Sequence, residues 1–243
     1  MTVGTGGAGT ARTPGRRRDA LRNRELLIEA AHEVFTEQGL EAPLDVIARR
    51  AGIGNATLYR HFPSRAALVD AVFRDVLKDT MTVGEEARTA DDAWAALTGY
   101  LEAVFAVLAA DRGTNDLMTT HLEGVDALQS VHAHNRETVE LLLSRGRDQG
   151  TVRADVTTED VLFSLAALGR AVPALASAAA PDAWRRPLAL LLDGLRASPT
   201  PSPLPSPALT ALQLGDVLRG LGPHRAPRGP ETPARPASLR RER

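Results

Sequence analysis

The stretch LDVIARRAGIGNATLYRHF, residues 44–62, decides the fold because its pattern indicates two short helices joined by a tight turn. Ile47 lies in an apolar segment of the first helix, and Gly52 stands where the chain must leave that helix. Glycine turns there without strain because it has no Cβ. Leu58 and Phe62 are four residues apart, so they share one buried face of the second helix.

The opposite face of the second helix carries small and polar side chains. Two helices with a glycine turn are the layout of a helix-turn-helix, whose second helix lies in the major groove of DNA. Arg60 suits bidentate bonding to guanine O6 and N7, whereas Ala56 suits contact with a thymine methyl group. Thr57, Tyr59 and His61 suit contacts with phosphate oxygens on either side.

The longer run IARRAGIGNATLYRHFPSRAALV, residues 47–69, resembles the N-terminal domain of the TetR-type family of bacterial one-component transcriptional regulators. The family pattern is close to IAxxAGVSxGTLYxHFxxKxxL. The resemblance implies an all-α protein with a three-helix DNA-binding domain followed by a helical dimerisation and ligand domain. It also implies phosphate contacts from residues matching Thr57, Tyr59, His61 and Arg65, and base contacts from residues matching Asn55, Ala56 and Arg60.

The motif departs from the family pattern at several positions. Gly54 replaces a serine that usually caps the recognition helix, so the cap is weaker or passes to Asn55. Asp45 would repel phosphate if it faced DNA, so the DNA contact that the family usually makes at this position is not expected of it. Ser64 can cap the next helix, but Ala67 lacks the acidic half of a capping box.

Composition narrows the class of protein. The 243 residues are 43% hydrophobic, which is ample for the core of one large or two small domains. The chain lacks cysteine, which excludes disulfides and thiolate zinc sites. The sequence contains no apolar run of about eighteen residues, and its first residues lack the apolar core of a signal peptide. We therefore expect a soluble cytoplasmic protein without a membrane partner.

Charge is unevenly distributed although the formal net charge is −1. Residues 1–65 carry ten arginines against seven acidic residues, whereas residues 66–197 carry twelve basic against twenty acidic residues. Residues 198–243 are again basic, with seven arginines against three acidic residues. Basic character around the helix-turn-helix is expected if that end of the molecule meets nucleic acid.

The N-terminal region is predicted to contain an arm and then the DNA-binding domain. Residues 1–19 read as a disordered basic arm, in which Arg16, Arg17 and Arg18 add affinity for DNA or form a solvated tail. Apolar residues at helical spacing predict the first helix over residues 19–38, before Gly39. The DNA-binding domain is assigned to residues 20–66.

Helical patterning continues through a second domain, residues 67–197, and no segment is patterned as a strand. A fourth helix from Ser64 to about Lys78 is expected to link the two domains. The link GTVRADVTTEDV, residues 150–161, resembles the connector that precedes the penultimate helix in the family. Further helices are predicted at about residues 91–110, 114–122, 124–149, 157–179 and 182–197.

From Ser198 the composition changes to a proline-rich segment, with prolines at every second position from Pro199 to Pro207. Such a segment forms neither a packed helix nor a β-ladder. Residues 198–243 are therefore expected to be mostly disordered, with one short amphipathic helix at residues 208–221. The sequence gives no role for that helix.

The second domain is expected to hold an effector and to form a homodimer. A mostly apolar cavity is predicted among the helices of residues 91–149, although the same residues also fit a plain core. Leucine stripes on the helices at about residues 157–179 and 182–197 predict a four-helix dimer face across a two-fold axis. The cavity candidates are Tyr100, Phe105, Met118, His121, His132 and Arg136, and the dimer candidates are Leu188, Leu191, Leu192 and Leu195.

A metal, a cofactor or an enzymatic activity is not expected. His132 and His134 are two residues apart, so on a helix their side chains point about 200° apart and do not readily share a metal. The sequence shows no glycine-rich phosphate loop, nucleophile elbow or glutamate-bearing zinc motif. It predicts a dimeric repressor that binds a double-stranded DNA operator and is released by a small apolar or amphipathic effector. The alternatives are a TetR-like activator and an interaction scaffold.

Overall fold

The computed structural model describes residues 14–119 and 124–221, and within these ranges every regular element is a helix. The expected all-α fold is confirmed, and the one β-type contact in the described residues is an isolated bridge between Val152 and Arg196. The helices are α1 (Pro14–Gln38), α2 (Leu44–Arg50), α3 (Asn55–His61), α4 (Arg65–Thr89), α5 (Ala93–Ala110), α6 (Arg112–Thr119), α7 (Asp126–Asp148), α8 (Thr158–Ala178), α9 (Arg185–Leu195) and α10 (Ala211–Leu221).

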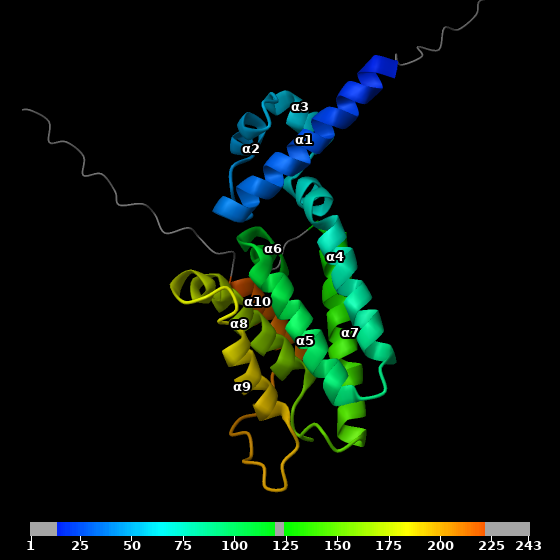
Figure 1. The fold of residues 1–243 in the computed structure, drawn as a ribbon, viewed down its shortest axis with the longest axis vertical. Helices are drawn as coiled ribbons and strands as arrows, with labels where there is room; N and C mark the ends of the chain where they lie inside the picture. Colours follow the sequence, from blue (N-terminus) through cyan, green and yellow to red (C-terminus); the bar gives the residue numbers. More distant parts are fainter. Residues whose placement is uncertain (1–13, 120–123, 222–243) are drawn as a thin grey trace, which may run out of the picture.

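The first three helices form a unit at one end of the molecule, and α4 runs from that unit into the body formed by the remaining helices (Figure 1). α1 buries an apolar stripe that contains Leu27, Val34 and Phe35, and Phe35 at its end packs on Phe73 of α4 and beside Gly113 of α6. Gly39, with a φ of 82°, ends α1, and Gly52, with a φ of 67°, makes the turn between α2 and α3. Both backbone conformations are in the left-handed region that favours glycine.

α1 begins at Pro14, five residues before the start that the hydrophobic period predicts. The expectation of a disordered arm is therefore wrong for Arg16, Arg17 and Arg18, which lie in the first turns of α1. Proline is pre-organised for the first helical position, and arginine is a good helix former, so an amphipathic stripe is not needed to extend the helix. Residues 1–13 lie outside the described residues.

The body is built around α5, which packs against α4, α6, α7 and α8. α4 continues to Thr89, past the end near Lys78 that the sequence predicts, because its buried stripe continues through Leu77, Thr80 and Gly84. The body then packs α4 along α7 over a long distance (Figure 1). At the other side of α5, Phe105 stacks on Trp184 with ring centroids 5.8 Å apart.

Two of the described helices have the length and composition of a membrane-spanning segment. α5 and α8 are 18 and 21 residues long and each reaches a mean hydropathy of 1.6. This is weak evidence for a membrane, because the core helices of soluble proteins meet the same criteria. α5 packs against α4, α6, α7 and α8, which accounts for its apolar composition, whereas only 22% of the α8 window is buried within the protomer.

The proline-rich segment leads back to the body. Residues 198–210 contain no helix, and the short helix expected after them is present as α10. α10 packs against α8, and the side chain of Leu214 is buried to 2% exposure. The expected short helix therefore forms one side of the body, while residues 222–243 are outside the described part.

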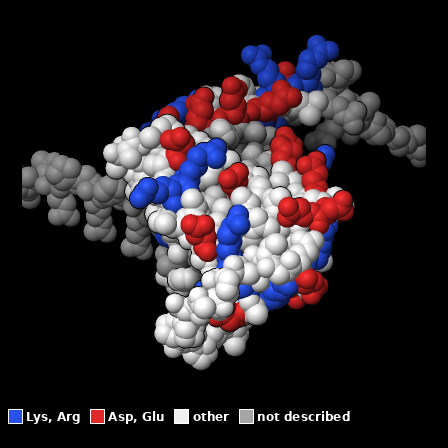
Figure 2. Space-filling model, turned by 60° about the horizontal axis from the view of Figure 1, so that its bottom comes forward, with Lys and Arg blue, Asp and Glu red and all other residues white. Residues whose placement is uncertain are grey.

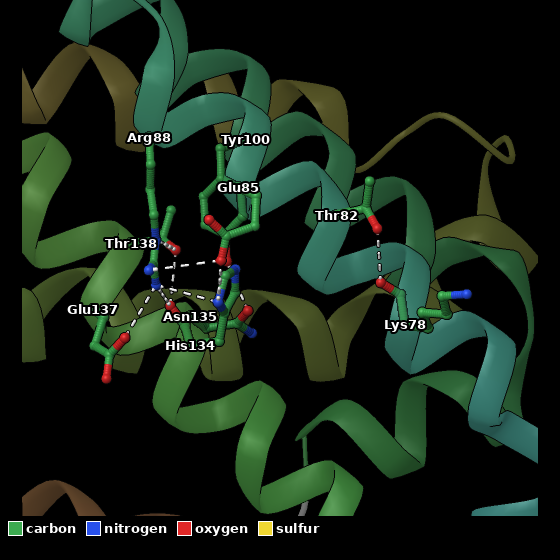
Figure 3. A network of polar contacts seen from close by, with 9 residues as sticks. All are labelled: Lys78, Thr82, Glu85, Arg88, Tyr100, His134, Asn135, Glu137 and Thr138. Atoms are coloured by element: carbon green, nitrogen blue, oxygen red, sulfur yellow. Dashed lines mark hydrogen bonds and ion pairs between the residues drawn. The ribbon is translucent and has the colours of Figure 1, made fainter.

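A polar network joins the second half of α4 to α7 (Figure 3). Arg88 donates from Nε to Thr138 Oγ1 at 2.8 Å and from Nη2 to the carbonyl oxygen of His134 at 2.9 Å. Burial lowers the pKa of His134, and the positive charge of Arg88 lowers it further. On the same helix, Asn135 Oδ1 accepts a hydrogen bond from the Tyr100 hydroxyl at 2.7 Å. α4 and α5 are thus both bonded to one turn of α7.

Gly84 permits this close approach, and replacing it tests the network. A Cβ at Gly84 would lie 2.1 Å from His134 Nε2 and 2.9 Å from His134 Cδ2, so the buried ring must move away from Arg88. We expect Gly84→Ala to lower the free energy of unfolding by about 1–3 kcal/mol, measured by urea denaturation. Gly99→Ala in α5 is the control, since no atom lies within 4 Å of its Cβ.

Gly99→Ala should raise stability by about 0.5–1 kcal/mol, because alanine restricts the unfolded chain and favours helix. Equal effects of the two substitutions would show that the α4–α7 contact tolerates a methyl group at Gly84.

Candidate functional site

The recognition helix α3 presents the face that the sequence predicts. Leu58 and Phe62 are buried at 1% and 2% exposure, which fixes the rotation of the helix about its axis. Tyr59 on the outer side is 54% exposed. Arg60 donates from Nη2 to Thr57 Oγ1 at 3.0 Å, so its guanidinium is held along the outer face. Asn55 and Ala56 are also exposed, while Thr57 and His61 are half-buried.

The start of α3 has no side-chain cap. Gly54 occupies the N-cap position, with a φ of −69° and a ψ of 145°, and offers no side-chain oxygen. Asn55 is already inside the helix, so the cap does not pass to it. By contrast, Ser64 caps α4 as expected, because its Oγ accepts a hydrogen bond from the Ala67 N–H at 3.1 Å.

Arg65 holds the DNA-binding unit together. Its Nη1 donates to the carbonyl oxygens of Leu40 and Ala42 at 2.6 and 2.8 Å. These carbonyls belong to the connection between α1 and α2, so Arg65 ties that connection to the start of α4. The sequence did not predict this positioning role, and the phosphate contact expected of Arg65 stays a prediction.

Positive charge next to α3 comes from α1 and α3 rather than from α2. Arg49 pairs with Asp45 at 2.9 Å, and Arg50 pairs with Glu33 and Glu37 of α1 at 3.0 and 2.9 Å. The α2 arginines are therefore compensated within the protein.

Arg24 of α1 lies over the ring of Phe62, with its Cζ 5.2 Å from the ring centroid. Burial lowers the pKa of His61, and the charges of Arg60 and Arg24 lower it further. Arg24, Arg60 and His61 thus form a basic cluster at the end of α3. Sequence patterning did not assign Arg24 to this site because its position depends on how α1 crosses α3.

The end of the molecule remote from α3 has a different surface. Figure 2 turns that end forward and shows acidic groups gathered along the edges of the face, with separate basic groups between them. This agrees with the acidic balance of residues 66–197. A surface of mixed and acidic character is not suited to the phosphate backbone of DNA.

A cavity of about 260 Å³ lies inside the body between helices that are distant in sequence. Three of the predicted cavity residues line it: Met118, His132 and Arg136. Arg136 pairs with Glu159 at 2.5 Å, so its charge is compensated. The lining is otherwise mostly apolar and includes Val104, Leu108, Thr119, Asn135, Leu162, Leu165, Ala166, Ala211, Leu214, Gly215, Leu218 and Arg219.

Two predicted cavity residues lie elsewhere in the core. Phe105 is fully buried and stacks on Trp184, so its prediction as a cavity residue is wrong. Tyr100 is buried at 1% exposure and reaches the cavity only through its hydrogen bond to Asn135. Both residues have the spacing of core positions, which periodicity cannot distinguish from a cavity wall. His121 lies outside the described residues.

The two neighbouring histidines have separate environments. His132 lines the cavity, whereas His134 packs against Gly84 on the other side of α7. Within residues 14–119 and 124–221, no three His, Asp or Glu side chains are grouped in a way that would hold a metal ion. The side chains of His132 and His134 point in different directions because residues two apart on a helix lie on different faces.

The leucine stripe of α9 belongs to the core of the protomer. Leu188, Leu192 and Leu195 are only 2%, 9% and 4% exposed, and they pack with Trp184 and residues of α5 and α8. Leu191 is partly buried against the same core. Leu188, Leu192 and Leu195 are therefore not available to a dimer partner, because a stripe shows that one helix face is buried but not against which element. A dimer face built from the helices at about residues 157–179 and 182–197 stays a prediction.

α6 connects the cavity to the DNA-binding unit. Met118 and Thr119 at its end line the cavity. Closer to its start, Asp116 Oδ2 accepts a hydrogen bond from the Leu40 N–H at 3.3 Å. A Cβ at Gly113 would lie 3.1 Å from the backbone of Phe35, so α6 and α1 are in close contact there. The sequence pointed to α4 as the link between the domains and gave no signal for α6.

An exposed recognition helix, a basic cluster beside it and a separate helical body define a helix-turn-helix DNA-binding transcription regulator. The family model described as bacterial regulatory proteins, tetR family, matches residues 27–72. A second model, described as the C-terminal domain of SbtR-like transcriptional regulators, matches residues 92–197. The chain belongs to the TetR family of transcriptional regulators.

Two solved structures are similar to this chain. A TetR transcription regulatory protein from Mycobacterium vanbaalenii is 33% identical, with 75% of this chain and 99% of that chain covered and a TM-score of 0.44. SmeT from Stenotrophomonas maltophilia shares the fold at 21% identity, covering 76% and 97% of the two chains with a TM-score of 0.54.

The matches to curated relatives are shorter. A helix-turn-helix-type transcriptional regulator of Staphylococcus aureus is 40% identical over 67 residues, which is 27% of this chain and 36% of the relative. The chain thus spans about a third of the length of the curated relatives that it matches.

The basic cluster predicts a pH dependence of DNA binding. The pKa of His61 is lowered in the free protein, so the imidazole is mostly neutral at pH 7. A phosphate beside it favours the imidazolium, so DNA binding raises this pKa and takes up a proton. We expect operator affinity to rise as the pH falls from about 7.5 to about 5.5, measured by fluorescence anisotropy at fixed ionic strength.

His61→Gln should remove this part of the pH dependence while leaving the helix in place. Parallel pH profiles of the two proteins would show that His61 does not meet a phosphate.

Proposed function

We propose that the protein is a cytoplasmic homodimeric repressor that binds a double-stranded DNA operator through α3 and leaves it when a small apolar or amphipathic effector enters the cavity. The observation that carries this proposal is the position of α6. One end of α6 lines the cavity, while Asp116 and Gly113 on the same helix contact α1. Occupation of the cavity can therefore act directly on the DNA-binding unit.

Ligand complexes of two structures with this fold support an effector. A structure of SmeT, described as the repressor of a multidrug efflux pump, holds triclosan, and one of FadR from Bacillus subtilis holds stearoyl-CoA. Both ligands have large apolar parts. The cavity in this chain has a mostly apolar lining with a few polar groups, which is the usual composition of a small-molecule site.

The effector must distinguish two states of the protein. A ligand shifts an equilibrium only by the difference between its affinities for the two states. In a dimer these states differ in the spacing of the two α3 helices. α4 runs from the DNA-binding unit into the body and α6 contacts α1, so a small movement of either helix can change that spacing.

The dimer face that we infer lies on the outer sides of α8 and α9. Phe163 on α8 is 39% exposed and Leu190 on α9 is 66% exposed. Ala167 and Ala171 follow Phe163 at intervals of four residues and are exposed too, so another helix can approach closely. These residues replace the buried leucine stripe as the candidate interface.

The first test concerns base recognition. Arg60→Ala should cost about 1–3 kcal/mol of operator affinity and flatten the preference at one base pair, because a bidentate guanine contact is lost. Arg60→Lys is the control for charge, since lysine keeps the charge but cannot make the bidentate contact. Lysine should therefore keep affinity for random DNA and lose the base preference.

Both variants are compared by footprinting and anisotropy on the DNA that flanks the gene, at several salt concentrations. A base preference that survives in both would place sequence reading in other residues of α3.

The second test concerns the effector. Ala166→Phe adds a ring to the wall of the cavity and should weaken binding of 1-anilinonaphthalene-8-sulfonate about tenfold or more, while operator binding without ligand is retained. Ala133→Phe is the matched control, because Ala133 is exposed on α7 next to His132. If apolar probes bind as well to Ala166→Phe as to the parent, the cavity is not the effector site.

The third test concerns the dimer. Leu190→Glu buries a charge in the proposed interface and should give a monomer in light scattering, with operator affinity reduced at least about tenfold. Leu212→Glu on α10, where the leucine is 74% exposed, should leave the molecular mass unchanged. A dimeric Leu190→Glu protein would place the interface on another face.

A further inference from the structure

The short helix α10 covers the cavity. It lies in sequence beyond the region that the C-terminal family model matches. That match ends at residue 197, whereas α10 spans Ala211–Leu221. α10 nevertheless contributes Leu214, Leu218 and Arg219 to the lining. Ala211 and Gly215 of α10 line the cavity too, and the remaining lining residues come from α5, α6, α7 and α8, so α10 is an added wall. In Figure 1 it crosses the body beside α8.

The chain holds α10 at this place by two local devices. Arg153 donates from Nη2 to the carbonyl oxygen of Ser202 at 2.8 Å, which fastens the proline-rich segment to the connector before α8. The Thr210 N–H donates to Gln213 Oε1 at 2.9 Å, and the Gln213 N–H donates to Thr210 Oγ1 at 3.3 Å. This reciprocal pair is a capping box, which fixes where α10 begins.

The contact between α10 and the body is nevertheless small. Leu214 is the one residue of Ala211–Gly220 that is buried, while Leu212 and Val217 are 74% and 36% exposed. An isolated helix of this length is marginal in water, so α10 depends on the burial of Leu214. The prolines from Pro199 to Pro207 cannot add backbone ladder bonds to hold it. α10 can therefore leave the body without unfolding the other helices.

We propose that α10 is a lid that sets the length of apolar molecule that the cavity accepts. With α10 in place the cavity measures about 260 Å³, just below the range of about 300–1,000 Å³ that is usual for ligand sites. Short aliphatic molecules fit beneath Leu214 and gain contact with it. Longer ones must displace α10, and the fraction of molecules with an open lid limits their apparent affinity. The inference rests on the proposed effector site and specifies its ligand class.

The test compares the full-length parent with Leu214→Ala and its matched control Leu212→Ala. Both substitutions remove the same atoms from the same helix, but only Leu214 is buried. The probes are the straight-chain 1-alkanols from hexanol to tetradecanol, measured by displacement of 1-anilinonaphthalene-8-sulfonate. Leu214→Ala should bind dodecanol and tetradecanol at least about threefold more tightly and hexanol at least about threefold more weakly than the parent, because lid opening becomes easier and a contact is lost. Leu212→Ala should keep the chain-length profile of the parent.

Operator binding in the same samples separates this inference from the proposed function. Unaltered operator affinity without alkanol verifies that the variants are folded. Suppose that Leu214→Ala binds the long alkanols more tightly and hexanol more weakly, but no alkanol changes operator affinity. This result supports the lid and contradicts effector-controlled repression. An unchanged profile, or equal weakening at every chain length, overturns the lid even if alkanols release the operator.

Discussion

The close packing of α6 against the end of α1 is the constraint on which the rest of the structure depends. Gly113 lets α6 approach Phe35, and Asp116 accepts the Leu40 N–H just after the turn that ends α1. Because packed cores deform little, a shift of α6 has to be transmitted to α1 or absorbed by breaking this contact. The orientation of α3 follows from that of α1, since Leu58 and Phe62 are buried in the same cluster as the α1 stripe.

The body supplies a rigid frame for this contact. Arg88 bonds α4 to α7, and Tyr100 bonds α5 to the same turn of α7 through Asn135 (Figure 3). Three long helices are therefore fixed to one another at this turn of α7. Under the proposed function, movement on ligand binding falls to the walls outside this frame, and the two shortest helices among them are α6, which contacts α1, and α10.

The sequence predicts the helices and the recognition face well because both depend on local spacing. Leu58 and Phe62 fix one face of α3, and Gly39 and Gly52 mark turns with positive φ. Sequence patterning does not predict which element of the protein covers a given helix face. The leucine spacing of α9 predicts a dimer face, but three of the four leucines at that spacing are buried in the protomer. The spacing of Phe105 fits a cavity wall, but its ring packs on Trp184. The lining from α10 and the bridge through α6 join segments that are distant in the chain, and no periodicity reports such contacts.

A ligand in the cavity can displace either of two short helices, α6 or α10. A molecule that only pushes α10 outward changes no contact with α1, so it binds without altering the affinity for DNA. A molecule that presses on Met118 or Thr119 acts on α6 and thus on the Asp116–Leu40 bond. Since coupling between two binding sites is reciprocal, DNA must weaken the binding of the second kind of molecule by the same factor and leave the first kind unaffected. The effector is therefore defined by which wall it moves as well as by whether it fits the cavity.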